Sequence, residues 1–259
     1  MNSRRSAPLR ENRHVRELLA VMKANNVDAA DLIAIISHVG TMERQLDTAV
    51  SELQIMRREL SSMREAQEHP AGTTLRNAVR TMETNVGEVR RRLESVKTDF
   101  VEDCKNTLTA VKEKGIDVLN NLSEFFRFKK GFQSCRDALA NGMASAEKSI
   151  AKIETFSKEY HQAESHIKNM ARTVAGKEME QEVKPVGKLA KALEAPYKAA
   201  FSCLKAAGQS VDAAIGGFER LEEAARPSVI AAMKTAGEQV SKQNAEKLPE
   251  KPKNREPGL

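Results

Sequence analysis

A seven-residue apolar repeat constrains the fold of this 259-residue chain more than any other feature. Two columns of apolar side chains recur every seven residues, at the a and d positions of four consecutive heptads. The a column is Val39, Leu46, Leu53 and Leu60, and the d column is Met42, Ala49, Met56 and Met63. Such a repeat winds helices around one another with a left-handed supercoil. The pattern therefore predicts a coiled-coil helix, and we call its eight a and d residues the heptad seam.

Charged residues beside the heptad seam favour a parallel pair of helices. In a parallel pair, a g residue faces the e residue five positions later on the partner. This register matches Glu52 with Arg57 and Glu59 with Arg64, whereas an antiparallel pair would bring like charges together. We therefore expect a parallel homo-oligomer, with a dimer favoured. The alternative is that the heptad seam packs on another helix of the same chain.

The composition favours long helices over a thick globular core. Hydrophobic residues make up 40% of the chain and charged residues 30%, but aromatic residues only 4%, and tryptophan is absent. Large apolar side chains are thus scarce, which suits narrow helical seams. No segment alternates β-branched and aromatic residues as strands do. The sequence predicts an all-α, elongated architecture of coiled-coil and helical-hairpin elements.

Turn and helix-breaking residues divide the chain into five expected regions. His69-Pro70-Ala71-Gly72 ends the heptad helix, and Pro185, Pro196 and Pro227 are expected to break the later part into shorter helices. Whether the middle region is a hairpin or one continuous rod stays open. The regions are a basic arm with a short helix (1–27), the heptad coiled-coil helix (28–69), a long helical hairpin (73–176), Ala-rich, Pro-broken helical segments (177–243) and a disordered tail (244–259).

Four of the eight phenylalanines gather within eight residues: Phe125, Phe126, Phe128 and Phe132. If Gly131 breaks the chain there, these rings fill the tip of an antiparallel hairpin, where bulky side chains are needed. Alternatively, aromatic rings interleaved with basic residues stack on single-stranded nucleic acid or enter a lipid interface. We favour the packed tip.

Basic residues are unevenly distributed in a chain whose net charge is +6. Such clusters attract acidic partners, either nucleic acid or a membrane surface, unless they are simply solvated helix faces. The possible contacts to an acidic partner are Arg4, Arg5, Arg90, Arg91, Arg92, Lys191, Lys198 and Lys205.

Residue types that commonly serve in catalysis or metal binding are scattered along the sequence. Cys104, Cys135 and Cys203 are far apart and odd in number, which indicates reduced thiols in a cytoplasmic protein. The five histidines show no metal-ligand spacing. No signal peptide or membrane-spanning stretch is expected. We expect no catalytic residues, no metal, no cofactor and no small-molecule substrate.

The segment ENRHVRELLAVMKANNVDAADLIAIISHVGTMERQLDTAVSELQIMRREL, from Glu11 to Leu60, resembles the N-terminal region of uncharacterised coiled-coil proteins carried by conjugative or integrative elements of Gram-positive gut bacteria. The resemblance implies a mobile-element context and assigns no activity or residue role. The expected function is a non-enzymatic, cytoplasmic helical scaffold or adaptor that self-associates. The alternatives are a nucleic-acid-associated accessory protein and a peripheral membrane-surface binder.

Overall fold

The computed structural model describes residues 6–62, 70–126, 128–174 and 188–246. All regular structure in these ranges is helical, which confirms the predicted all-α class. The elements are η1 (Leu9–Glu11), α1 (Arg13–Ala24), α2 (Ala30–Ser62), α4 (Pro70–Lys114), η2 (Ile116–Asn121), α5 (Leu122–Phe125), α6 (Lys129–Val174) and α7 (Lys188–Glu246).

Side-chain caps set the first helix boundaries. The Asn12 side chain accepts a hydrogen bond from the backbone N–H of His14 at 3.0 Å, which begins α1. The Asp28 side chain likewise accepts a hydrogen bond from the backbone N–H of Ala30, at 2.8 Å, at the start of α2. Between them, Asn26 adopts a left-handed φ of 56°, a conformation that asparagine tolerates better than most residues. The chain therefore turns sharply between α1 and α2.

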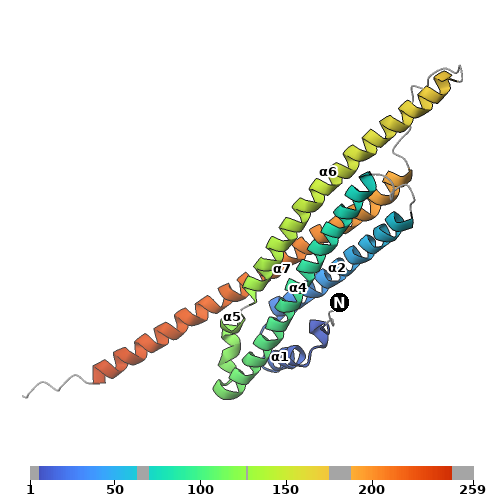
Figure 1. Cartoon of the computed structure of the whole chain (residues 1–259). Helices are drawn as coiled ribbons and strands as arrows, with labels where there is room; N and C mark the ends of the chain where they lie inside the picture. The colour runs from blue at the N-terminus through green and yellow to red at the C-terminus, as the bar shows by residue number, and fades with distance from the viewer. Residues whose placement is uncertain (1–5, 63–69, 127, 175–187, 247–259) are drawn as a thin grey trace, which may run out of the picture.

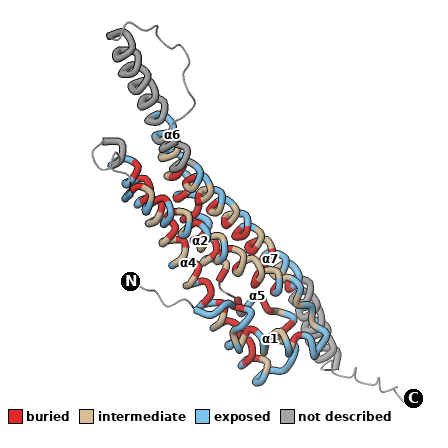
Figure 2. The backbone as a smooth tube through the Cα atoms, turned by 90° about the vertical axis from the view of Figure 1, so that its right-hand side faces the viewer, coloured by how far each residue is buried: buried red, intermediate tan, exposed pale blue. Residues whose placement is uncertain are grey.

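The long helices pack side by side into an elongated bundle (Figure 1). α2 packs mainly on α7 and also on α4, while α6 packs on both α4 and α7. Buried residues recur along α2, α4 and the described parts of α6 and α7 (Figure 2). At opposite ends, α6 and α7 extend away from the rest of the bundle (Figure 1).

The heptad seam is buried within a single copy of the chain. Its seven described residues, from Val39 to Leu60, are each at most 1% exposed. α7 and α4 are the helices that pack on α2, so they cover the seam. Met63 lies outside the described residues. The seam thus packs on helices of its own chain, the alternative that the sequence left open.

α4 and α6 run antiparallel, so the middle of the chain forms a hairpin and not one continuous rod (Figure 1). The predicted break at Gly131 is wrong, because Gly131 lies within α6. α4 ends instead before Gly115, whose φ of 88° favours glycine. The short helices η2 and α5 then connect it to α6.

The phenylalanines of this connection join three helices. Phe126, Phe128 and Phe132 are buried; Phe126 and Phe128 contact Phe100 of α4, and Phe128 also contacts Phe132 and Phe218 of α7. The ring centre of Phe128 lies 4.9 Å from that of Phe100 and 5.3 Å from that of Phe218. Because these three rings are buried, a nucleic-acid base cannot stack on them. The side chain of Phe125 lies outside the described residues.

The expected breaks at Pro196 and Pro227 are wrong, because both residues lie inside α7, which is one helix. The helix also reaches Glu246, so residues 244–246 are not part of a disordered tail. A proline in a helix costs about 3 kcal/mol or more. Near Pro196, burial of Tyr197, Ala200 and Leu204 offsets that cost. Pro185 lies outside the described residues.

Candidate functional site

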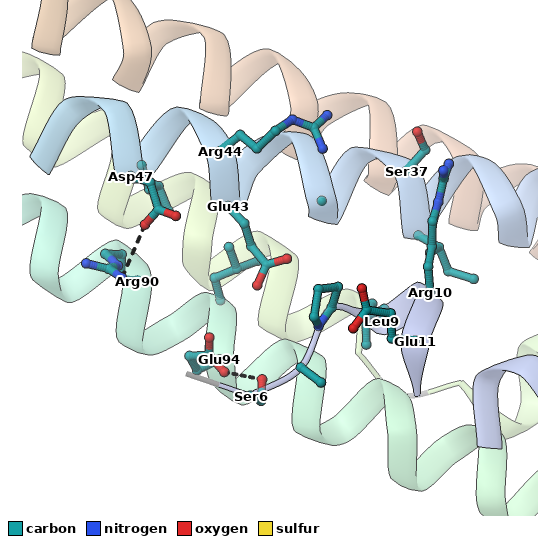
Figure 3. A pocket seen from close by; sticks show the side chains of 16 residues that line it. Ser6, Leu9, Arg10, Glu11, Ser37, Glu43, Arg44, Asp47, Arg90 and Glu94 are labelled. Carbon is teal, nitrogen blue, oxygen red and sulfur yellow. Dashed lines mark hydrogen bonds and ion pairs between the residues drawn. The ribbon is translucent and has the colours of Figure 1, made fainter. Parts of the chain in front are cut away.

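The candidate site is a charged cavity between the N-terminal segment, α2 and α4 (Figure 3). Its volume is about 640 Å³. Residues 6–11 form one wall, residues of α2 between Ile36 and Asp47 form a second, and residues of α4 between Arg90 and Glu94 form a third. Charged side chains of both signs line it, so its electrostatics depend on how these charges are paired.

Apolar packing holds the N-terminal wall in place. Leu9 is 3% exposed and belongs to the main core. A short helical turn follows, in which the backbone N–H of Glu11 donates to the carbonyl oxygen of Pro8 at 2.9 Å. The turn positions Arg10 and Glu11 at the cavity (Figure 3). The N-terminal segment is therefore an integral part of the site.

Lys97 of α4 is the central charge beside this cavity. Its side chain is buried, and its ammonium forms ion pairs with Glu43 of α2 and with Glu94 of α4, the latter at 3.5 Å. The ammonium also donates a hydrogen bond to the backbone carbonyl oxygen of Ser6 at 3.2 Å. A buried ammonium loses its hydration, and these oxygen partners compensate for that loss. One side chain thereby links the N-terminal segment, α2 and α4.

Two further contacts add to the charge pairing around the cavity. The Ser6 hydroxyl donates to the Glu94 carboxylate at 2.5 Å, and Arg90 forms an ion pair with Asp47 at 3.3 Å (Figure 3). Glu43, Glu94 and Asp47 therefore each have a cationic partner from the same chain. These contacts fasten the N-terminal segment, α2 and α4 together, while Arg10, Glu11 and Arg44 also line the cavity.

The structure separates the predicted basic contacts and pairs several of them with carboxylates. Arg91 and Arg92 both form ion pairs with Glu88 in the same helix, and Arg92 also donates to Ser134. Arg90 pairs with Asp47, as described above.

The predicted lysines are on a different helix from these arginines. On α7, Lys198 pairs with Glu154 of α6 at 3.3 Å, and Lys205 is exposed. Arg4, Arg5 and the side chain of Lys191 lie outside the described residues. The described members of the predicted set are therefore divided between two helices, α4 and α7.

The charges beside the heptad seam also have neighbours within the chain. Arg57 lies 4.0 Å from the carboxylate of Glu83 on α4. One carboxylate oxygen of Glu59 is buried and has no hydrogen-bond partner among the described residues. Arg64 lies outside them. The expected pairs of Glu52 with Arg57 and of Glu59 with Arg64 between two copies stay a prediction.

The three cysteines are free thiols in the structure. Burial raises the pKa of Cys104 to about 12, with a further contribution from the nearby charge of Asp103. Burial also raises the pKa of Cys135 to about 12 and that of Cys203 above its ordinary value. A thiol is a nucleophile mainly as its thiolate, so these shifts make all three poor nucleophiles near neutral pH.

The described residues contain neither a metal-binding group nor a membrane-spanning helix. In these ranges, no cluster of three or more His, Cys, Asp or Glu side chains is arranged to hold a metal ion. Across the same part of the chain, every helix is too short or too polar to cross a membrane.

The apolar patterning of the sequence did not identify Lys97, the buried lysine beside the cavity. Lys97 lies four residues after Leu93 and three before Phe100, and both of these apolar residues are buried. This spacing places the lysine on the buried face of α4. The position of Lys97 within an apolar stripe could therefore have indicated that it is buried. Its partners could not have been predicted in the same way, because they come from distant parts of the sequence.

A sequence model described as a family of unknown function, DUF6674, matches residues 11–256. No curated protein and no solved structure matches the chain.

Proposed function

We propose that this chain, which belongs to the DUF6674 family of unknown function, is a non-enzymatic helical scaffold or adaptor. The observation that carries the proposal is the elongated bundle from which α6 and α7 extend at opposite ends (Figure 1). Two separated helical extensions on one body can engage two partners at once, which is the physical requirement for an adaptor.

The charged cavity supports this proposal because its charges serve the fold. Lys97 joins the N-terminal segment to α2 and α4, and Arg90 adds an ion pair between α4 and α2. A ligand would have to displace these internal pairs to use the same groups. The site is therefore better suited to stiffening the bundle than to binding a charged substrate.

Self-association through the heptad seam is not proposed in the form that the sequence led us to expect. Because α7 and α4 cover the heptad seam within one chain, two copies can share the seam only by exchanging a covering helix. We propose that the seam serves the fold of each copy, and that partners bind at the extensions of α6 and α7. The resemblance of Glu11–Leu60 supports a role connected with a mobile genetic element, and the three free cysteines support a cytoplasmic location.

Chemical crosslinking in the native cell followed by mass spectrometry tests the adaptor proposal. The full chain should crosslink to other proteins through α6 and α7. Crosslinks confined to α1 and α2, or none to another protein, would contradict the proposal.

Analytical ultracentrifugation with far-UV circular dichroism tests the role of the heptad seam. The double variant Leu46→Asp/Leu53→Asp should lose cooperative unfolding, because both side chains are buried in the core of one chain. The control Thr48→Asp/Ser51→Asp adds the same two charges at exposed positions of α2 and should unfold as the original chain does. A dimer that the Leu variant converts into a folded, fully helical monomer would show that the seam joins two copies.

A further inference from the structure

A second cavity, of about 590 Å³, lies between the C-terminal part of α2 and the N-terminal part of α4. Its lining includes the buried side chains of Leu60 and Val79, one from each helix. Three arginines also line it: Arg57 from α2, and Arg76 and Arg80 from α4. We call this cavity the arginine notch. It shares no lining residue with the charged cavity at the N-terminal segment.

The positions of the arginines on their helices explain why they converge. Arg76 and Arg80 are four residues apart, so they lie on the same face of α4. Arg57 comes from the facing helix and lies on the same cavity. Like charges at this spacing destabilise a helix slightly. The notch thus concentrates positive charge at a small cost to the fold.

Carboxylates compensate little of this charge. Glu83 is the one carboxylate among the lining residues, and it lies 4.0 Å from Arg57, whose side chain is 73% exposed. The three arginines and one glutamate give a formal charge of +2. No described residue forms an ion pair with Arg76 or Arg80; Arg76 donates only a long hydrogen bond to the Thr73 hydroxyl, at 3.4 Å.

This lack of pairing distinguishes the notch from the basic residues that join two helices of the bundle. Arg90, Lys97 and Lys129 each have carboxylate partners on a second helix. Arg220 of α7 likewise binds Asp31 of α2 at 2.7 Å. In those places the cations fasten helices together, whereas Arg76 and Arg80 have no such role within the described chain.

We propose that the arginine notch binds phosphate groups. The planar guanidinium presents paired N–H donors that match two phosphate oxygens, and several guanidinium groups together suit a multiply charged anion. Thr73 and Asn77 line the same cavity and add a hydroxyl and an amide donor. A free pyrophosphate or triphosphate and the backbone of a nucleic-acid strand share this chemistry.

Isothermal titration calorimetry of the full chain with pyrophosphate, at low ionic strength, tests the proposal. The variant Arg76→Gln/Arg80→Gln should weaken binding about tenfold or more, because hydrogen bonds to charged groups contribute about 1.5–3 kcal/mol. The matched control is Arg13→Gln/Arg16→Gln, which removes the same two charges from exposed positions on α1. It should change the affinity less than about twofold if the site is local.

A second titration, with a single-stranded oligonucleotide, distinguishes the source of the phosphate. Tighter, notch-dependent binding of the oligonucleotide identifies a nucleic-acid strand, and tighter, notch-dependent binding of pyrophosphate identifies a small anion. Three results would overturn the proposal: no binding of either probe, equal losses in the notch variant and the control, or unchanged binding in the notch variant. Circular dichroism of each variant verifies that its helical content is unaltered.

Discussion

Gly131 of α6 packs directly against Val96 of α4: a Cβ atom built on residue 131 would lie 2.7 Å from Val96 Cγ2. Real Cβ atoms essentially never approach another atom so closely. The absence of a side chain at Gly131 therefore lets the two helices of the hairpin come together beside the phenylalanine cluster. This glycine contributes to close packing and does not end a helix.

We predict that Gly131→Ala destabilises the chain although alanine is the better helix former. Alanine usually gains about 0.5–1 kcal/mol over glycine within a helix. The added methyl would instead force Val96 and its helix to move, at a cost of about 1–3 kcal/mol. The free energy of unfolding, measured by urea denaturation with circular dichroism, should therefore decrease.

Gly87 provides the matched control, since it lies within α4 and a Cβ atom there would have no neighbour within 4 Å. Gly87→Ala should leave stability unchanged or raise it by up to about 1 kcal/mol. Equal or greater stability of Gly131→Ala would show that the helices separate there without cost.

We predict that Lys97→Met lowers the free energy of unfolding by about 2–4 kcal/mol, because it leaves Glu43 and Glu94 without their shared cation. The loss is smaller than for a fully buried pair, since both carboxylates partly reach solvent. Hydrogen exchange at Leu9–Glu11 should also become faster, because the lysine no longer holds Ser6. Urea denaturation and amide exchange measure the two effects.

Lys105→Met is the control for this experiment. Lys105 is exposed and pairs only with Glu102 of its own helix, at 3.2 Å, so its loss should cost less than about 0.5 kcal/mol. In the double variant Lys97→Met/Glu43→Gln, the cost should be smaller than the sum of the two single costs. Additive costs would mean that the two side chains do not interact.

We predict that stability decreases as the pH rises above the ordinary thiol pKa of 9.0. Burial raises the pKa of Cys104 and Cys135 in the folded chain to about 12, so between these values the unfolded chain loses thiol protons that the folded chain keeps. The contribution is fully present below pH 9.0 and falls by at most about 1.4 kcal/mol per pH unit for each thiol. Burial also raises the pKa of Tyr197, which acts in the same direction.

Urea denaturation from about pH 8 to about pH 10.5 measures this dependence. The variant Cys104→Ala/Cys135→Ala should show a shallower decline than the original chain, whatever its stability at pH 8. Identical slopes for the two proteins would mean that these thiols do not titrate differently in the folded and unfolded states.

The heptad repeat predicted a helix over residues 28–69, of which α2 occupies residues 30–62, and it predicted the seam that α2 buries, because a seven-residue apolar spacing is a local property of the chain. It did not predict which helix covers Leu46 and Leu53, since the same stripe fits a second copy or a helix of the same chain. Here α7, more than a hundred residues later in the sequence, packs on it.

The different roles of Gly115 and Gly131 also could not be predicted from the sequence around them. Both are glycines near the hairpin connection, yet only Gly115 adopts a positive φ and follows the end of a helix. Gly131 is helical and is needed because Val96 approaches it. The two roles differ only in the packing around each residue, which no sequence pattern near them records.

The sequence by itself determined an all-helical chain, its apolar stripes and the capped starts of α1 and α2, because helix periodicity and capping depend on residues within a few positions of one another. The tertiary structure decided which helices pair, kept Pro196 inside a continuous α7, and surrounded Lys97 with oxygens from the N-terminal segment, α2 and α4. Those outcomes depend on burial and charge pairing between segments far apart in the chain. Such interactions outweigh local preferences only once the bundle has formed.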